Sequence, residues 1–245
     1  MDHVLTEQGL RLTYLRDPNV MNDLDQDRIL EDLSDDTPDG DPLSTLTQYR
    51  LADYDHLVLV TDQSSGRHLA FLAASDRATA NEEFLLLESI FVATPARGQN
   101  LMRRMIALAM LRIGGLGPVP SIIAACTRNP LCYRIMRDTA RRLVGAELYP
   151  NAESVTINFH TATLAQRIAR QISPNSRFHA ATGMLRGTVG MMGSGYRRAR
   201  ANDKKIDNLL GSCVEPAERM LAVLDLRGEN EADIFDSARR IYRLK

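Results

Sequence analysis

The sequence contains no tryptophan and only three cysteines, Cys126, Cys132 and Cys213. Their number is odd and no pair has CxxC spacing, so neither a disulfide framework nor a zinc site is indicated, and reduced thiols are expected. No run approaches the roughly 18 unbroken apolar residues of a membrane-spanning helix. The first residues also lack the basic start and apolar run of a secretory signal. These absences predict a cytoplasmic protein without a membrane partner.

The chain also lacks an excess of charge of either sign, since its formal net charge is -1. This balance argues against nucleic acid as a partner. The charges are nevertheless segregated, because residues 23–41 are strongly acidic and residues 97–142 strongly basic. The basic stretch at 196–200 is interpreted as a solvated loop rather than a contact to nucleic acid or an acidic partner. With 44% hydrophobic residues among 245, the chain can bury one substantial core or two modest ones.

Hydrophobic periodicity predicts an α/β protein whose first 150 residues contain a meander of three antiparallel strands. Strands are expected at 9–16, 56–61, 69–74, 83–92 and 121–126, and helices near 24–33, 44–51, 100–113 and 129–143. Beyond residue 150 we expect helices at 163–172 and 206–210, strands near 180–189 and at 220–226, and a final helix.

One strand–loop–helix junction has the features of an anion-binding site. The strand ending at Phe91 and Val92 leads into the run Arg97-Gly98-Gln99-Asn100-Leu101-Met102 at the start of a helix. The first backbone N–H groups of a helix have no partner within it, and the helix dipole places positive charge there, so a diphosphate can bind. A glycine lets a ligand approach the main chain closely. Many α/β proteins contain such a junction for ordinary turn reasons, so this feature alone is a weak signal.

The junction resembles the pyrophosphate-binding motif of the GNAT N-acetyltransferases, V-x-P-x-x-R-G-x-G-x-G/A, because Val92, Arg97 and Gly98 have its spacing. The match is partial. Pro95 lies one position late, and Asn100 replaces the second glycine, although asparagine tolerates left-handed backbone angles. Met102 adds bulk where the family keeps the backbone accessible.

A second element supports the resemblance, because residues 127–133 follow a short strand where the family places an asparagine, here Asn129, and its next helix. The resemblance covers roughly residues 10–150. It implies a GNAT-like mixed central sheet flanked by helices, with residues 1–150 forming an acyl-CoA-binding domain. Residues 151–245 would form a C-terminal α/β extension that completes the sheet and the acceptor pocket.

The resemblance implies transfer of an acetyl group from acetyl-CoA to the amine of an unidentified acceptor by direct attack. Glu88, which interrupts an apolar strand four residues before Val92, is the implied general base. A carboxylate in an apolar strand tends to have a raised pKa, which suits a base that works near neutrality. The alternative is that Glu88 faces solvent on the far side of the sheet.

Tyr133 is the implied proton donor to the departing thiolate. It lies earlier in its helix than the tyrosine of the family, whose place Met136 occupies, so a core tyrosine is the alternative interpretation. The resemblance assigns acetyl-CoA binding to a set of residues at the two elements: Phe91, Val92, Arg97, Gly98, Gln99, Asn100, Leu101, Met102 and Asn129. It assigns no metal and is compatible with a homodimer.

The acidic segment at 23–41 lies where this family often builds part of its acceptor site, so a cationic acceptor is a hypothesis. Two other interpretations stay open. One is a non-catalytic module of the same fold that binds an acyl-CoA or a protein partner, which Met102 and the position of Tyr133 favour. The other is an enzyme with a longer acyl donor, or with a thioester other than CoA.

Overall fold

The structure is a computed structural model that describes residues 3–7, 9–18, 21, 23–34, 50–154, 157–187, 201–211 and 218–243. Cys213, the basic stretch at 196–200, residues 35–41 of the acidic segment and nearly all of the helix expected at 44–51 lie outside the described residues.

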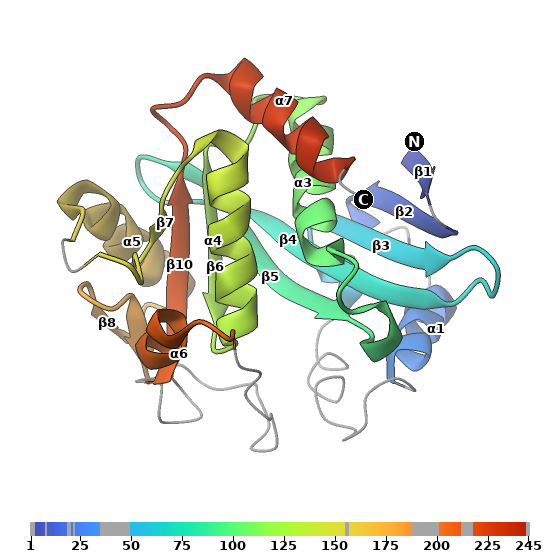
Figure 1. The fold of residues 1–245 in the computed structure, drawn as a ribbon, viewed down its shortest axis with the longest axis horizontal. Coiled ribbons are helices and arrows are strands. Elements are labelled where there is room, and N and C mark those ends of the chain that lie inside the picture. Colours follow the sequence, from blue (N-terminus) through green and yellow to red (C-terminus); the bar gives the residue numbers. More distant parts are fainter. Residues whose placement is uncertain are drawn as a thin grey trace. The chain divides into compact units, whose positions relative to one another are not determined.

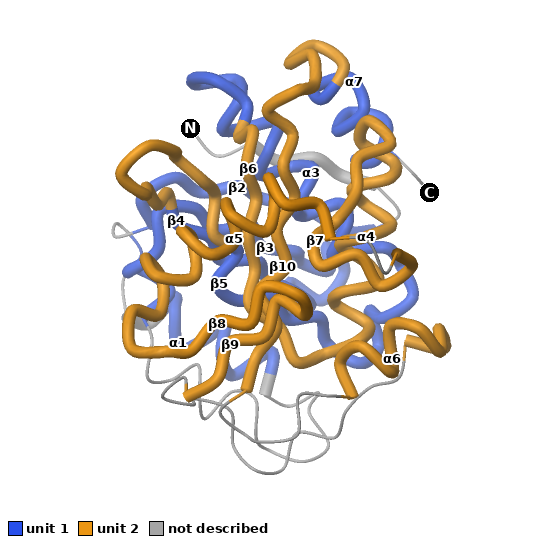
Figure 2. Tube along the Cα trace, turned by 90° about the vertical axis from the view of Figure 1, so that its left-hand side faces the viewer, with its two compact units in different colours: residues 1–75, 87–119, 234–245 blue, residues 76–86, 120–233 orange. Residues whose placement is uncertain are grey.

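The chain forms two compact units (Figure 2). Unit 1 comprises residues 1–75, 87–119 and 234–245, and unit 2 comprises residues 76–86 and 120–233. Each unit therefore contains segments that lie far apart in the sequence. The domain boundary expected at residue 150 stays a prediction.

Unit 1 is built on the N-terminal meander (Figure 1). Its strands are β1 (His3–Glu7), β2 (Leu10–Arg16), β3 (His56–Asp62), β4 (His68–Ala78) and β5 (Glu83–Val92), of which β4 and β5 continue into unit 2. The pairs β1–β2, β2–β3 and β3–β4 are antiparallel. Its helical elements are α1 (Asp23–Ser34), the short 3₁₀ helices η2 (Leu51–Asp53) and η3 (Thr94–Ala96), α3 (Leu101–Gly114) and most of α7 (Glu231–Tyr242).

The helices of unit 1 follow from their apolar faces. In α1 the buried residues Ile29 and Leu33 recur at helical spacing and pack against Leu57 and Phe71 of the strands. Nearly every residue of α3 from Leu101 to Met110 is buried, because this helix contacts β2 and β3 and also α7.

Unit 2 is centred on β10 (Arg219–Asp225), which pairs antiparallel with β6 (Ile122–Thr127), β7 (Leu148–Tyr149) and β9 (Met184–Arg186). Strand β8 (Arg177–His179) pairs with β9. The helices are α4 (Pro130–Val144), α5 (Phe159–Ile172) and α6 (Lys204–Gly211). The core of the unit joins Leu164 and Ile168 of α5 to Leu221 and Val223 of β10.

The α/β class expected from the sequence is confirmed, because mostly antiparallel strands are flanked by helices. Three local expectations were incomplete. β1, β7 and β8 were missed because they are two to five residues long, too short for a periodic pattern. The strand expected near 180–189 is only the three-residue β9 within the described part of that range. Helix α5 begins earlier than expected because the Asn158 side chain accepts hydrogen bonds from the N–H groups of His160 and Thr161.

No helix among the described residues is long and apolar enough to cross a membrane.

Candidate functional site

The predicted phosphate-binding junction lies in unit 1, between β5 and α3. The Ala93 N–H donates to the Leu69 carbonyl at 2.8 Å, which fixes the chain as it leaves β5. η3 then turns the chain, with the Arg97 N–H donating to the Thr94 carbonyl at 3.2 Å. Residues 97–100 are all exposed, so the loop that follows is accessible to a ligand.

Two residues of this loop have left-handed backbone angles. Gly98 has φ +85° and Asn100 has φ +57°. A Cβ atom added at Gly98 would meet no heavy atom within 4 Å, so the backbone angle rather than crowding favours glycine there. Asn100 adopts the left-handed angle that its side chain was expected to tolerate.

The start of α3 is not capped by its own N-cap side chain. Asn100 occupies the N-cap position but makes no capping hydrogen bond, and its Oδ1 instead accepts from Arg103 Nη1 at 3.1 Å. The first backbone bond of the helix runs from the Arg104 N–H to the Asn100 carbonyl at 3.1 Å. Backbone N–H groups before that bond have no acceptor within the helix. This arrangement suits an anion that supplies the missing acceptors.

The side chains of the junction point in different directions. Leu101 and Met102 are 2% and 5% exposed, so both pack in the core of unit 1. Phe91 is also buried, and its ring stacks on Phe71 with the centroids 6.4 Å apart. Met102 therefore places its bulk inside the protein rather than at the loop surface, which removes one argument for a non-catalytic module.

Arg97 is exposed, and its Nε donates to the Val92 carbonyl at 3.2 Å. This contact holds Nε of the guanidinium beside the last residue of β5. Glu88 lies on β5, the strand that ends at Val92, and is exposed after four buried residues. Both residues belong to unit 1. The predicted base therefore lies on β5, and the predicted phosphate-binding loop follows the end of the same strand.

Tyr133 and Asn129 belong to unit 2. The Tyr133 side chain is fully buried, and its hydroxyl donates to the Pro150 carbonyl and accepts from the Ala152 N–H at 3.2 Å. Burial raises the pKa of Tyr133 to about 12. These contacts favour the interpretation of Tyr133 as a core residue, and its role as a proton donor stays a prediction.

Asn129 is the N-cap of α4. Its Oδ1 accepts from the Leu131 N–H at 2.9 Å, and Pro130 occupies the first helical position, as the sequence predicted. The side-chain oxygen is therefore engaged in the helix cap.

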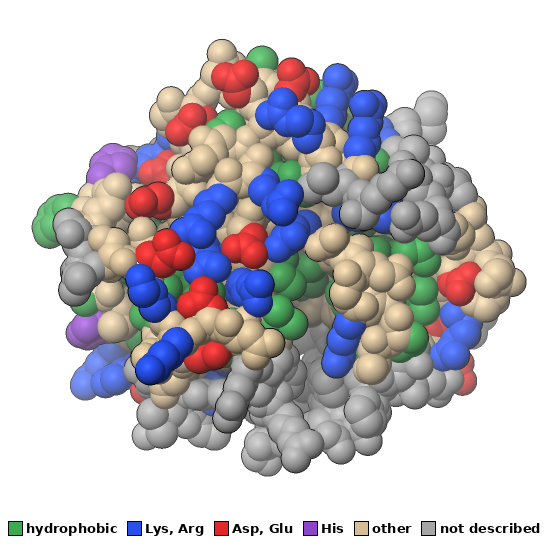
Figure 3. Space-filling model, viewed as in Figure 1, with side chains coloured by type: hydrophobic (Ala, Val, Ile, Leu, Met, Phe, Trp, Pro, Cys, Tyr) green, Lys and Arg blue, Asp and Glu red, His purple; other side chains and the backbone are tan. Residues whose placement is uncertain are grey.

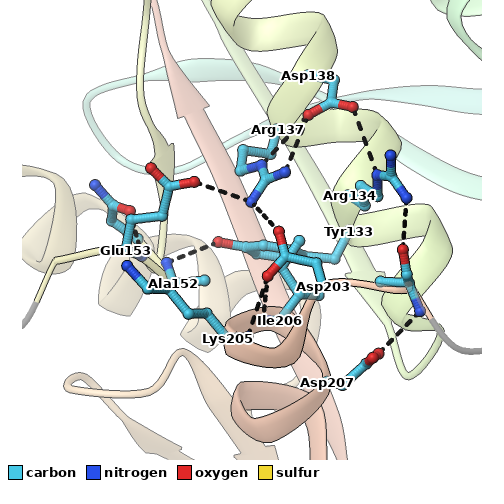
Figure 4. A network of polar contacts seen from close by, with 12 residues as sticks. Tyr133, Arg134, Arg137, Asp138, Ala152, Glu153, Asp203, Lys205, Ile206 and Asp207 are labelled. Atoms are coloured by element: carbon cyan, nitrogen blue, oxygen red, sulfur yellow. Dashed lines mark hydrogen bonds and ion pairs between the residues drawn. The ribbon is translucent and has the colours of Figure 1, made fainter.

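A charged network that sequence reasoning missed surrounds Tyr133 in unit 2 (Figure 4). Arg137, which is 8% exposed, pairs with Asp138, with Glu153 at 3.1 Å and with Asp203 at 2.9 Å. The hydrogen bond from Arg137 holds the pKa of Asp203 below its usual range. Over α4 and α6 basic and acidic side chains are intermixed on the surface (Figure 3). Their spacing in the sequence gave no signal, because residues 137 and 203 meet only in the folded chain.

The carboxylate of Asp32, in the part of the acidic segment that forms α1, is held by His68. Asp32 accepts from the His68 N–H at 2.9 Å and lies 2.7 Å from His68 Nδ1, and its backbone carbonyl accepts from Arg67. Burial alone would raise the pKa of Asp32, but the hydrogen bonds from His68 outweigh it and lower the pKa below its usual range. Asp32 therefore ties α1 to β4.

Unit 1 also has a hollow of about 540 Å³ beside the loop, to which Pro95 and Gln99 contribute, together with Asp62 and Arg67 from the β3–β4 turn. Within the described residues no group of three or more His, Cys, Asp or Glu side chains could hold a metal ion.

No protein-family model and no curated protein sequence matches the chain. Among solved structures it is similar to the GNAT family N-acetyltransferase YhbS from Escherichia coli in complex with CoA. The identity is 16%, the coverage 54% of this chain and 71% of that chain, and the TM-score 0.39. It is also similar to a putative GNAT acetyltransferase from Desulfovibrio desulfuricans, with 12% identity, coverage of 88% and 99%, and a TM-score of 0.39.

A third similar structure is the diaminobutyrate acetyltransferase EctA from Paenibacillus lautus in complex with its substrate and coenzyme A. Here the identity is 15%, the coverage 89% of this chain and 96% of that chain, and the TM-score 0.39. The solved structures that this chain is similar to include several GNAT N-acetyltransferases.

Proposed function

We propose that the chain is a GNAT-type N-acetyltransferase that transfers an acetyl group from acetyl-CoA to the amine of an acceptor. The observation that carries the proposal is the loop before α3, where Gly98 and Asn100 are left-handed and the helix start has no N-cap hydrogen bond. A diphosphate at this position would accept from backbone N–H groups and from Arg97.

The proposed reaction needs a neutral amine, a polarised thioester carbonyl and a proton for the thiolate. Glu88 takes a proton from the ammonium form of the acceptor, directly or through water, and the amine then attacks the thioester carbon. The backbone N–H of Val92 donates to the developing oxyanion. The C–N bond forms as the C–S bond breaks. Because the Tyr133 hydroxyl already donates to Pro150, we propose that water or the acceptor protonates the departing thiolate.

Donor binding is tested by calorimetric titration of acetyl-CoA into the wild-type protein and into Arg97→Ala. Loss of a charge-assisted hydrogen bond is expected to raise the Kd by about 10-fold. Arg170→Ala is the matched control, since Arg170 is exposed in the last turn of α5 in unit 2. Absence of binding to the wild-type protein, or an equal loss in both variants, would overturn the donor site.

The chemical step is tested with Glu88→Gln after an acceptor screen. Removing a general base is expected to lower kcat by about 100-fold, while the Kd for acetyl-CoA stays unchanged. A variant with wild-type kcat would show that Glu88 is not the base.

We also propose that the acceptor is cationic, which the exposed carboxylates of α1, namely Asp25, Asp27 and Glu31, support. Joint replacement of these three by Asn and Gln is expected to raise KM for a diamine and leave KM for a neutral-chain amine unchanged. Asp32 is kept in this variant because it holds β4. If the triple variant and the wild-type protein have equal KM values for the diamine, the result contradicts a cationic acceptor.

The second candidate is a module that binds an acyl-CoA without catalysis, and the engaged hydroxyl of Tyr133 favours it. Tight acetyl-CoA binding without transfer to any amine of a broad panel would select this candidate.

A further inference from the structure

A buried arginine connects the loop at residues 97–100 of unit 1, called the phosphate loop below, to the C-terminal helix α7. Arg104 lies in the first turns of α3 and is only 4% exposed. Its Nε donates to the backbone carbonyl of Tyr242 at 3.3 Å, and its guanidinium carbon lies 5.8 Å from the centre of the Tyr242 ring. In Figure 1, α7 crosses α3. Arg104 thus joins two helices that are more than a hundred residues apart in the sequence.

This connection joins two helix termini, the start of α3 and the end of α7. The backbone N–H of Arg104 makes the first bond of α3, to the carbonyl of Asn100, so Arg104 closes the phosphate loop onto the helix. Tyr242 is the last residue of α7, and carbonyls at a helix C-terminus have no partner within the helix. A cation is also favoured at that end by the helix dipole. The guanidinium of Arg104, near the start of α3, therefore donates a hydrogen bond to a carbonyl at the end of α7 that has no partner within that helix.

The contact is not easily exchanged for water. A guanidinium that is almost fully buried requires hydrogen-bond partners, because an unpaired buried charge is costly. The residues of α7 on the same side, Ile234, Ala238 and Ile241, are buried as well. At the far end of α3, a Cβ at Gly114 would meet Val119 at 2.6 Å and lie 3.4 Å from the Phe235 ring of α7. α7 is therefore packed along α3, with contacts near both ends of that helix.

We propose that docking of α7 on α3 sets the affinity of the phosphate loop for the diphosphate of the acyl donor, with Arg104 as the positioning residue. This inference rests on the proposed function. When α7 is docked, the Arg104 side chain is fixed and the first turn of α3 is held with Gly98 and Asn100 in their left-handed geometry. When α7 is released, Arg104 loses its hydrogen bond to the Tyr242 carbonyl, so its side chain is no longer fixed and the first turn of α3 is held less firmly.

Coupling between two sites is reciprocal, so a bound diphosphate must in turn hold α7 in place. This is tested on the unmodified full chain by amide hydrogen exchange with and without CoA. We expect CoA to slow exchange in residues 234–242 by a larger factor than in α5 of unit 2. Equal factors in α7 and α5, or no change in α7, would overturn the inference.

Variants provide the second test, by calorimetric titration with CoA. Arg104→Met is expected to raise the Kd at least about 5-fold, and Arg104→Lys is expected to recover part of the affinity because an ammonium can still donate to the Tyr242 carbonyl. Arg112→Met is the matched control, since it removes the same charge from the last turn of the same helix. Its Kd is expected to equal that of the wild-type protein.

A double-mutant cycle separates positioning from a general loss of stability. If Arg104 acts through the loop, combining Arg104→Met with Arg97→Ala raises the Kd by less than the product of the single effects. Strictly multiplicative effects would contradict the inference.

Failure of the wild-type protein to bind CoA overturns both the proposed function and this inference. Wild-type binding with equal affinities in Arg104→Met and Arg112→Met overturns this inference alone. If Arg104→Met does not fold, the exchange experiment on the wild-type protein decides.

Discussion

At the scale of single residues, backbone angle and hydrogen bonding decide what each position of the candidate site can do. Gly98 and Asn100 both have positive φ, which costs a residue with a Cβ roughly 1–2 kcal/mol unless its side chain compensates. The short polar side chain of Asn100 does so through its contact with Arg103. An alanine at position 98 has no polar side chain that could compensate for the cost of the positive φ, so this position depends on glycine.

We therefore expect Gly98→Ala to lower the free energy of unfolding by about 1 kcal/mol and to weaken acetyl-CoA binding. Gly117→Ala is the matched control, because position 117 is equally open but does not have a positive φ. Urea unfolding and calorimetric titration of both variants provide the measurement. Equal stability of the two variants would show that φ at position 98 carries no cost.

Asp32 gives a pH-dependent prediction. Because hydrogen bonds from His68 lower its pKa in the folded protein, it adds stability above its unfolded pKa of about 3.9. That stability is lost as the pH falls through the lower folded pKa. Asp32→Asn should thus be less stable than the wild-type protein at pH 7, and the difference should shrink below about pH 4.

Urea unfolding between pH 7 and pH 3 measures this difference. Asp27→Asn serves as the control, since Asp27 lies on the same helix with an exposed side chain. A difference between wild type and Asp32→Asn that stays constant down to pH 3 would contradict the assignment.

At the scale of elements, capping residues set where the helices of unit 2 begin. Asn129 caps α4 with one hydrogen bond and Asn158 caps α5 with two. The two asparagines form a matched pair, because only Asn129 follows a strand at a position where the GNAT resemblance implies cofactor binding.

Asn129→Ala and Asn158→Ala are each expected to lower the free energy of unfolding by about 1 kcal/mol. If Asn129 also binds the donor, only its variant will raise the Kd for acetyl-CoA beyond that of the wild-type protein. Thermal unfolding and titration test the two effects separately. A raised Kd in Asn158→Ala would show that the binding loss reflects stability rather than contact.

At the scale of the whole molecule, each compact unit has its own hydrophobic core. Phe71 belongs to the core of unit 1 and Ile168 to that of unit 2, and both side chains are fully buried. Separate cores allow separate opening reactions, because the stability of a segment depends on the contacts within its own cooperative unit.

Phe71→Ala and Ile168→Ala are expected to cost about 3–5 and 2–5 kcal/mol, respectively. Native-state hydrogen exchange should show faster exchange mainly in β3 for the first variant and mainly in α5 for the second. Equal acceleration throughout the described residues in both variants would show one cooperative unit instead.

The sequence by itself determined the elements whose signals are local. The helix of residues 101–114 and the cap at Asn129 depend on spacing and side-chain chemistry within a few residues. Both were predicted, the helix with each end one residue earlier. For Asn100 the sequence indicated only that a left-handed backbone angle is tolerated. Glu88 is exposed on β5. Its catalytic role, like the other site assignments, stays a prediction.

Only the tertiary structure decided which distant residues meet. It buried Met102, engaged the Tyr133 hydroxyl with Pro150, and joined Arg104 to Tyr242. It also placed β10 between β6 and β9, although β10 is the last strand along the described residues. A periodic pattern reports which face of an element is apolar, but it carries no information on which of several apolar faces will cover it. That choice is made by the packing of the whole chain.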